Sequence, residues 1–321
     1  MDDSIKFPRI LVTGGAGFVG SEYIRSAATG KLFGGLPRKI LILDVLTYAG
    51  NLKRLADVSQ MESVEFILGS VTDRQLVDEL VSSTDAVLHF AAESHVDRSI
   101  LDSTKFVETN ILGTNILLNA ALRHSKTIIL ISTDEVYGSL ESGDAGESFP
   151  LKPSSPYSAS KSAADLLGLA FFATHGLDVR ITRAANNYGK FQDPEKLIPK
   201  SIQAIQSGLG IKLFGNGRNI RNWLHISDHC DAISRVLHLG QAGEVYNIGG
   251  NESYSNIEIA GILLDFFKKP QFEIEFIEDR LGHDWRYSVN SSKIKKSLGW
   301  VPQRQLGDSI QEIVDGLKFL S

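Results

Sequence analysis

The stretch RILVTGGAGFVG, residues 9–20, restricts the possible folds of this chain more than any other part of the sequence. Residues 9–13 form an apolar run typical of a buried strand, and a glycine turn follows directly. Gly15, Gly17 and Gly20 match the spacing G-x-G-x-x-G, with Gly14 just before them. Glycines at this spacing permit a tight turn and let backbone amides approach a pyrophosphate at the start of the next helix. The stretch therefore predicts a dinucleotide-binding unit, and a turn without a ligand is the alternative.

Strands and helices are predicted to alternate over the first part of the chain. Such alternation implies a parallel sheet covered by helices on both faces, which is the doubly wound Rossmann-type α/β fold. The expected strands lie at 39–43, 64–68, 86–92, 127–131 and 178–182, and the expected helices at 74–81, 104–124 and 157–174.

An acidic residue follows the second predicted strand. Asp44 stands about where a carboxylate binds the ribose 2′-hydroxyl of a dinucleotide. An arginine close after this acid would be expected for binding the 2′-phosphate of NADP, and none is present. The sequence therefore favours NAD over NADP.

After Arg183 the pattern becomes less regular. We expect residues 1–185 to form an NAD-binding Rossmann domain, with return segments near 222–250, and residues 186–321 to form a smaller α/β region that mainly holds the substrate. Short elements and polar clusters predict a thin core for the second region, so it should pack on the first and not stand alone. Its expected helices lie at 197–207, 227–240, 257–267 and near 291–298 and 307–319, with strands within 215–225 and 244–248.

Three polar residues follow the strand predicted at 127–131. The end of a buried strand in such a sheet is where ligands bind, and here it presents Thr133, Asp134 and Glu135 together. Adjacent carboxyls repel each other's second charge, which favours one protonated and one ionised member. The pattern predicts an acid–base pair, and a simple turn cap is the alternative.

A helix is predicted to open after Pro156, which suits a first helical turn. The i, i+4 spacing puts Tyr157 and Lys161 on one helix face. We expect the ammonium of Lys161 to lower the pKa of the Tyr157 phenol. With the carboxyl pair nearby, this set exceeds what an alcohol dehydrogenase needs, although two surface residues would show the same spacing.

Composition and charge limit the classes of partner and the cellular compartment that we expect for this protein. The 33 basic and 38 acidic residues are well mixed and give a net charge of −5, which argues against nucleic acid. The single cysteine, Cys230, excludes an internal disulfide and fits a reducing compartment. The polar start MDDSIK is not expected to be a secretory signal, and no apolar run approaches membrane-spanning length. We therefore expect a cytoplasmic protein with no membrane partner.

A metal site is not expected. His225 and His229 are four residues apart, but no third ligand is evident near them in the sequence.

Several motifs together resemble a known family. They are TGGAGFVG, the D-LTYAGN segment at 44–51, HFAAESHVDRS, STDEVYG, YSASK, NNYG with PEKLIP, and DRLGHDWRY. Over residues 9 to 302 the chain is similar to the dTDP-glucose 4,6-dehydratases, within the extended short-chain dehydrogenase/reductase group. The glycines and the Tyr157–Lys161 pair are shared by that whole group, whereas YAGN, PEKLIP and the Thr133–Glu135 triplet are specific to the dehydratases.

The resemblance implies NAD-dependent conversion of dTDP-glucose to dTDP-4-keto-6-deoxyglucose, by C4 oxidation, loss of water between C5 and C6, and C6 reduction. Tyr157 would take the C4 hydroxyl proton, with Thr133 bonded to the same oxygen and Lys161 to the nicotinamide ribose. Asp134 and Glu135 would handle the loss of water. The implied cofactor-binding residues are Gly14, Gly15, Gly17, Phe18, Val19, Gly20, Asp44, Thr47, Ser70, Ala91, Tyr157 and Lys161.

The resemblance also implies a set of residues around the nucleotide sugar. Ser70 departs from the family, which has an aspartate near the adenine amine at that position. The implied substrate-binding residues are Ser94, His95, Thr133, Asn186, Glu195, Lys196, Leu197, Arg221, Asn251, Arg280 and His283.

Two other functions stay open on the sequence. One is a different NAD-dependent nucleotide-sugar enzyme, such as a UDP-sugar dehydratase, an epimerase or a decarboxylase. The other is a non-catalytic NAD-binding regulator. An epimerase does not need the carboxyl pair and a regulator need not keep Tyr157 and Lys161, so the dehydratase is favoured. The helices expected at 104–124 and 157–172 carry apolar surface that either pairs in a homodimer or is buried within the monomer.

Overall fold

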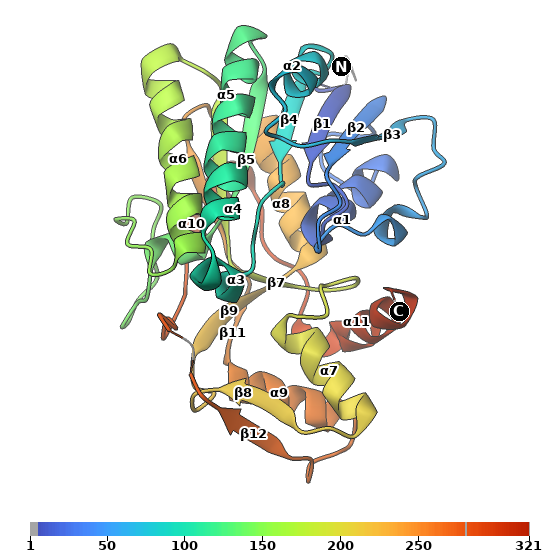
Figure 1. Cartoon of the computed structure of the whole chain (residues 1–321), viewed down its shortest axis with the longest axis vertical. Coiled ribbons are helices and arrows are strands. Elements are labelled where there is room, and N and C mark those ends of the chain that lie inside the picture. The colour runs from blue at the N-terminus through green and yellow to red at the C-terminus, as the bar shows by residue number, and fades with distance from the viewer. Residues whose placement is uncertain (1–5, 280, 321) are drawn as a thin grey trace.

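A seven-stranded parallel sheet forms the centre of the larger part of the molecule (Figure 1). The computed structural model describes residues 6–279 and 281–320. The strand order is β10-β6-β5-β4-β1-β2-β3, which confirms the doubly wound α/β fold. Its strands are β1 (Arg9–Thr13), β2 (Lys39–Asp44), β3 (Val64–Leu68), β4 (Ala86–His89), β5 (Thr127–Thr133), β6 (Val179–Ala184) and β10 (Val245–Ile248).

Helices cover both faces of the sheet because the strands are apolar on both sides. Along β1, Ile10 and Val12 belong to one apolar cluster and Leu11 to another, as expected when successive side chains alternate across a strand. The first cluster includes α1 (Phe18–Ala28) and α8 (Ile226–Leu239), which pack on each other. The second includes α2 (Arg74–Ser82) and α5 (Thr114–Arg123), with α6 (Pro156–His175) beside α5.

The helix expected at 104–124 is not a single α-helix. It consists of α4 (Thr104–Phe106), a π-helical segment η2 (Val107–Gly113) and α5. Local contacts accompany the wider winding. The amide of Asn110 bridges the backbone of Glu93 and the hydroxyl of Ser160, and a side chain at Gly113 would meet Val71 at 2.6 Å. A short helix, α3 (Val96–Leu101), was not expected from the sequence.

The second region, mostly after Ala184, contains two small sheets. One has the order β11-β9-β7 and the other pairs β12 with β8. Neither β8 nor β12 was predicted. Their bounds are β7 (Asn186–Tyr188), β8 (Ile211–Phe214), β9 (Ile220–His225), β11 (Glu252–Ser255) and β12 (Ile274–Ile277), and the helices are α7 (Leu197–Ser207), α9 (Asn256–Phe266) and α11 (Leu306–Leu320). The remaining helix, α10 (Ser292–Leu298), packs on β10 and α8 of the larger part.

This second region has an apolar cluster of its own, so the expectation of a thin core is wrong. Trp223 and Leu263 are at most 5% exposed, and the cluster also takes in one face of α7 and of α11. The helices supply apolar residues at i, i+3 and i+4 spacing, as in Ile198, Ile202 and Ile205. Irregular loops between these helices hid the pattern in the sequence.

The chain crosses between the two parts more than once. After β9 it returns to the large sheet, where α8 packs on α1 and β10 pairs with β6. The only cysteine, Cys230, lies on α8, and it is fully buried with a free thiol. Among the described residues, no helix is long and apolar enough to cross a membrane.

Candidate active site

A deep cleft of about 930 Å³ runs along the carboxyl ends of the strands and separates the large sheet from the second region. One side is lined by the glycine turn after β1 and the loop after β2. The other is lined by the loop that leads into α7 and by parts of β9. The end of β5 and the start of α6 also line the cleft.

The glycine turn has a backbone that side chains would disrupt. Gly14 has φ of +69°, and a Cβ there would lie 2.5 Å from the amide nitrogen of Ala91. A Cβ at Gly20 would lie 2.4 Å from the carbonyl oxygen of Gly14. Gly15 does not line the cleft, because it faces Ile42 and allows close helix–strand packing.

Asp44 lies at the end of β2 and lines the cleft. Its carboxylate accepts the backbone amides of Ala16 at 2.9 Å and Leu46 at 2.8 Å, which ties the glycine turn to the loop after β2. Backbone amides, an ordered acid and the open space between them suit a dinucleotide. Phe18, Val19, Thr47, Ser70 and Ala91, all expected near the cofactor, line the same cleft.

The acid pair stands where β5 ends. The Thr133 hydroxyl caps the 3₁₀ turn (Asp134–Tyr137) by accepting the backbone amide of Glu135 at 3.3 Å, and lies 3.3 Å from Asp134 Oδ1. Burial, and then the charge of Glu135, raise the pKa of Asp134 to about 8. Asp134 Oδ2 is buried and has no hydrogen-bond partner among the described residues. Both effects favour the protonated form of Asp134.

Tyr157 and Lys161 are brought to the same cleft by α6. The helix begins with a capping box, in which the side chain of Ser155 accepts the backbone amide of Ser158 at 3.1 Å. Lys161 reaches across to β5 and donates to the carbonyl of Ile131 at 2.7 Å. These anchors fix the helix face that carries both side chains.

The expected effect of Lys161 on the phenol is wrong in this structure. Burial, followed by the charges of Glu135 and Asp134, raises the pKa of Tyr157. Burial also lowers the pKa of Lys161 to about 8. Burial of the ring and then the two nearby carboxyls therefore set the direction of the pKa shift of Tyr157, which the i, i+4 spacing alone could not reveal.

Most residues expected around the substrate line the cleft, namely Ser94, His95, Asn186, Glu195, Lys196, Leu197, Arg221 and His283. Glu195 bridges the two sides of the cleft, because its carboxylate lies 3.0 Å from His95 and 2.7 Å from Arg98. Arg221 stacks 4.3 Å above the ring of Tyr287 and donates to the carbonyl of Asp284 at 2.9 Å.

Of the two remaining residues expected to bind the substrate, the structure describes one. Asn251 lies outside the cleft lining, because it is exposed and its amide donates to the carbonyl of Pro302 at 3.1 Å. Arg280 lies outside the described residues. His225 and His229 have separate partners, Ser227 and Asn187, and the described ranges hold no group of three residues suited to a metal.

The sequence reasoning missed aromatic residues in the lining. Burial raises the pKa of Tyr48 to about 12, and the guanidinium of Arg98 lies 3.7 Å from its ring centroid. Tyr287 lines the cleft beside Arg221. Both lie inside motifs that carried the resemblance, YAGN and DWRY, so their position there was the available signal.

A Rossmann-type sheet with this glycine turn, an acid after β2 and a tyrosine–lysine pair on α6 defines an extended short-chain dehydrogenase/reductase. The family model described as GDP-mannose 4,6 dehydratase matches residues 11–313. The chain belongs to this family of nucleotide-sugar 4,6-dehydratases, and within it to the dTDP-glucose 4,6-dehydratases.

Relatives and solved structures agree on this placement. The chain is 47% identical to a dTDP-glucose 4,6-dehydratase of Streptomyces niveus, over 96% of this chain and 92% of that one. It is 45% identical to the low-salt glycan biosynthesis protein Agl12 of Haloferax volcanii, over 95% and 97%. The structure of DesIV, a dTDP-glucose 4,6-dehydratase from Streptomyces venezuelae with NAD and TYD bound, has a TM-score of 0.94 at 45% identity and 97% coverage of both chains.

Proposed function

We propose that this protein converts dTDP-glucose to dTDP-4-keto-6-deoxyglucose with NAD as a cofactor that is used and regenerated. The observation that carries the proposal is the carboxyl pair at the end of β5, in which Asp134 is buried beside Glu135, so that its pKa is raised and its protonated form is favoured. Removing water between C5 and C6 needs an acid for the leaving hydroxyl and a base for the C5 proton. The site holds both within reach of the Tyr157–Lys161 pair.

The residues that would hold NAD are the Gly14–Gly20 turn, with Phe18 and Val19, and Asp44 toward the adenosine ribose. Thr47, Ser70 and Ala91 complete that side of the cleft. Lys161 is assigned to the nicotinamide ribose. When bound, NAD would supply the hydride acceptor for oxidation at C4 and, in its reduced form, the hydride donor for reduction at C6. The positive charge of the oxidised nicotinamide ring would favour the ionised form of Tyr157.

Each proton transfer is assigned to a side chain of this protein. Tyr157 takes the proton from the C4 hydroxyl, and Thr133 hydrogen-bonds the same oxygen. Once C4 is a ketone the C5 hydrogen becomes acidic, and Glu135 removes it. Asp134 gives its proton to the hydroxyl that leaves C6, and the unpartnered Oδ2 is the atom that fits this role.

The nucleotide and sugar are assigned to the other side of the cleft. Ser94 and His95 would face the hexose. Arg221 is suited to a diphosphate, because its fork can bind two oxygens at once. Asn186, Glu195, Lys196, Leu197 and His283 complete the proposed substrate set, together with Arg280 from the resemblance. Asn251 is left out of this set, because it lies outside the cleft lining.

Direct assay tests the proposal. The protein is incubated with dTDP-glucose and separately with UDP-glucose, and product is followed by alkaline absorbance of the 4-keto sugar and by mass. We expect loss of one water from dTDP-glucose, with solvent deuterium at C5 when the reaction runs in heavy water. Preference for UDP-glucose would move the assignment to a UDP-sugar dehydratase. Inversion at C4 without loss of water would indicate an epimerase, and no turnover of either sugar would favour a regulator.

We also infer a homodimer in the cytoplasm. Support for the dimer is apolar surface on neighbouring helices, where Val107 and Leu112 on η2 and Leu166 and Phe172 on α6 are between 38% and 55% exposed. Figure 1 shows α5 and α6 side by side on the outer face of the sheet. A single reduced cysteine supports the location, which cell fractionation with an antibody would test.

A further inference from the structure

Arg54 is a buried arginine at the junction of three loops. It lies in the 3₁₀ helix η1 (Leu52–Leu55) and is 3% exposed. Its guanidinium donates to the carbonyl oxygens of Ala16 at 3.2 Å, Ala49 at 2.5 Å and Phe191 at 3.1 Å. Ala16 belongs to the glycine turn and Ala49 to the loop after β2, whereas Phe191 belongs to the loop between β7 and α7. One side chain thus joins the two sides of the cleft.

The opposing charges also come from both sides. Burial lowers the pKa of Arg54, and nearby Arg25 lowers it further, whereas Asp193 on the substrate side and Asp44 on the cofactor side favour the charged form. Its hydrogen bonds, by contrast, go to backbone carbonyls and so depend on the loop conformations. A desolvated guanidinium with rigid, forked donors holds its acceptors at fixed angles.

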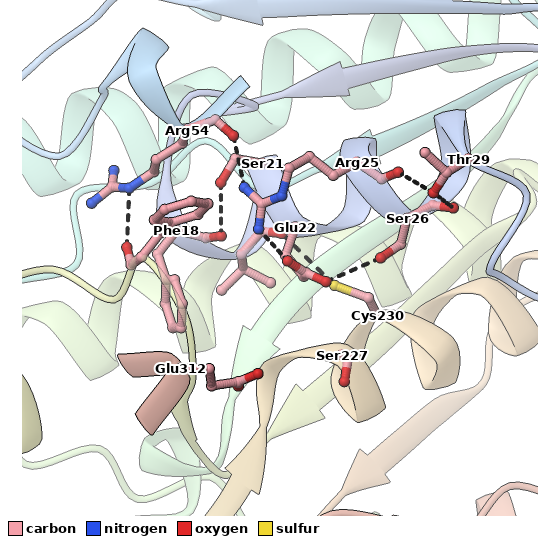
Figure 2. Close-up of polar contacts among 12 residues, drawn as sticks. Phe18, Ser21, Glu22, Arg25, Ser26, Thr29, Arg54, Ser227, Cys230 and Glu312 are labelled. Carbon is pink, nitrogen blue, oxygen red and sulfur yellow. Dashed lines mark hydrogen bonds and ion pairs between the residues drawn. The ribbon is translucent and has the colours of Figure 1, made fainter. Parts of the chain in front are cut away.

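A second arginine contacts both Arg54 and Phe191. Arg25, on α1, donates to the carbonyl of Arg54 at 2.7 Å, and its guanidinium lies 4.7 Å from the ring centroid of Phe191. Figure 2 shows Arg25 and Arg54 beside each other, with Glu22 pairing with Arg25. Phe191 has φ of +68°, which is unusual for a residue with a side chain, so these contacts define its loop closely.

The loop that begins at Phe191 carries the substrate side of the cleft. Gln192, Glu195, Lys196 and Leu197 all follow within six residues and line it. Gln192 donates to the carbonyl of Asn187 at 2.8 Å, which continues the connection toward β7. A shift of the Phe191 carbonyl would therefore move these groups relative to the glycine turn.

We propose that Arg54 is a positioning residue that sets the spacing between the cofactor side and the substrate side of the cleft. It is needed for hydrogen transfer from the sugar more than for the affinity of either ligand. The proposal rests on the proposed function, since it concerns a reaction between two bound molecules. Transfer requires near contact of the reacting atoms, and a displacement of about 1 Å can lower the rate roughly 10²-fold.

The test compares two buried arginines. Arg54→Met keeps the unbranched apolar stem of the side chain and removes its donors. Arg180→Met is the matched control, because Arg180 is 4% exposed and also donates to two carbonyls, Val236 at 2.9 Å and Leu237 at 2.7 Å, outside the cleft lining. We expect kcat of Arg54→Met to fall by about 10²-fold. Its KM and its calorimetric NAD affinity should stay near wild type, and Arg54→Lys should recover part of kcat. Arg180→Met should lose stability but keep kcat.

A second readout needs no turnover. Hydrogen exchange measured by mass spectrometry should accelerate in Arg54→Met within residues 189–197 and 14–20, and stay unchanged there in Arg180→Met. The proposal is overturned if Arg54→Met keeps wild-type kcat and exchange, which would make Arg54 merely structural. It is also overturned if NAD binding is lost outright, which would make Arg54 a cofactor-binding residue. If wild type turns over no nucleotide sugar, the proposed function fails, whereas the exchange experiment still decides whether Arg54 couples the two sides.

Discussion

At the scale of single residues, the two members of the carboxyl pair have different environments, which supports the proposed division of roles between them. Asp134 and Glu135 are adjacent and chemically similar, yet Asp134 is buried and Glu135 is only partly buried. Burial, followed by the charge of Glu135, raises the pKa of Asp134 to about 8. The sequence predicted one protonated and one ionised member but could not say which, because burial depends on the packing of β5. Likewise, spacing located Tyr157 and Lys161 but could not reveal that burial, followed by the nearby carboxyls, raises the phenol pKa.

Separate loss of the two bases should stop the reaction at different steps. Tyr157→Phe removes the base for C4 oxidation, so no reduced nicotinamide and no product should form. Glu135→Gln should still oxidise C4 but fail to remove the C5 proton, with product formation reduced by ~10²–10⁴-fold. Rapid-mixing absorbance of the reduced nicotinamide, followed by quenching and mass analysis, separates the two. Normal turnover by Glu135→Gln would contradict its assignment as the C5 base.

The raised pKa of Asp134 predicts a pH dependence of both rate and stability. The elimination step should decline as pH rises through about 8, because the acid loses its proton. For stability, the folded-state pKa lies above the usual 3.8, so the protonated carboxyl stabilises the fold most below about pH 4. This stabilisation decreases as the pH rises to about 8, and above that pH the effect of Asp134 on the free energy of unfolding no longer changes.

Asp134→Asn should therefore abolish most elimination yet raise Tm near pH 8 by a few degrees, since about 1 kcal/mol corresponds to roughly 2–4 °C in somewhat smaller chains. Thermal unfolding of both proteins at pH 5 and pH 8 measures the difference. An equal Tm difference at both pH values would contradict the raised pKa.

At the scale of elements, the regular parts of the fold could be predicted, and the irregular ones could not. Period and glycine spacing located the sheet strands and α6, because buried strands and amphipathic helices repeat on a short scale. The π-helical winding of η2 was missed because the contacts that accompany it are not local in sequence, since Glu93, a partner of Asn110, is 17 residues away. The strands β8 and β12 were missed because they pair only with each other, and Phe276 is 52% exposed.

Asn110 should be costly to replace. Its amide makes hydrogen bonds of 2.9–3.0 Å to both backbone groups of Glu93 and to Ser160, and it is 1% exposed. Asn110→Ala leaves buried polar groups unpaired, each costing about 1–3 kcal/mol. Urea unfolding should show this loss of stability. We also expect kcat to fall, because Asn110 holds the backbone of Glu93, and the next two residues, Ser94 and His95, line the cleft.

Asn119→Ala is the comparison for this change, since Asn119 bonds only to Asn115 within the same stretch of helix and lies away from the cleft lining. It should cost less and leave kcat unchanged. If both variants lose stability equally and retain full kcat, η2 has no part in shaping the cleft.

At the scale of the whole molecule, the exposed apolar side chains of η2 and α6 lead to a test of assembly. Leu166→Glu places a charge on the inferred contact and should convert a dimer to a monomer in analytical ultracentrifugation. Leu209→Glu is the control, because Leu209 is 65% exposed and follows α7, away from that surface. A monomeric wild-type protein, or a dimer unaffected by Leu166→Glu, would contradict this interface.

The late return of the chain to the large sheet affects how the protein folds while it is synthesised. Strand β6 is paired with β5 on one side, but its other neighbour, β10, is translated about 60 residues later. Until Val245–Ile248 leave the ribosome, β6 presents an open edge of unpaired backbone groups, which is a template for pairing between nascent chains. Stalled or truncated products that end before β10 should therefore depend on chaperones far more than the finished chain.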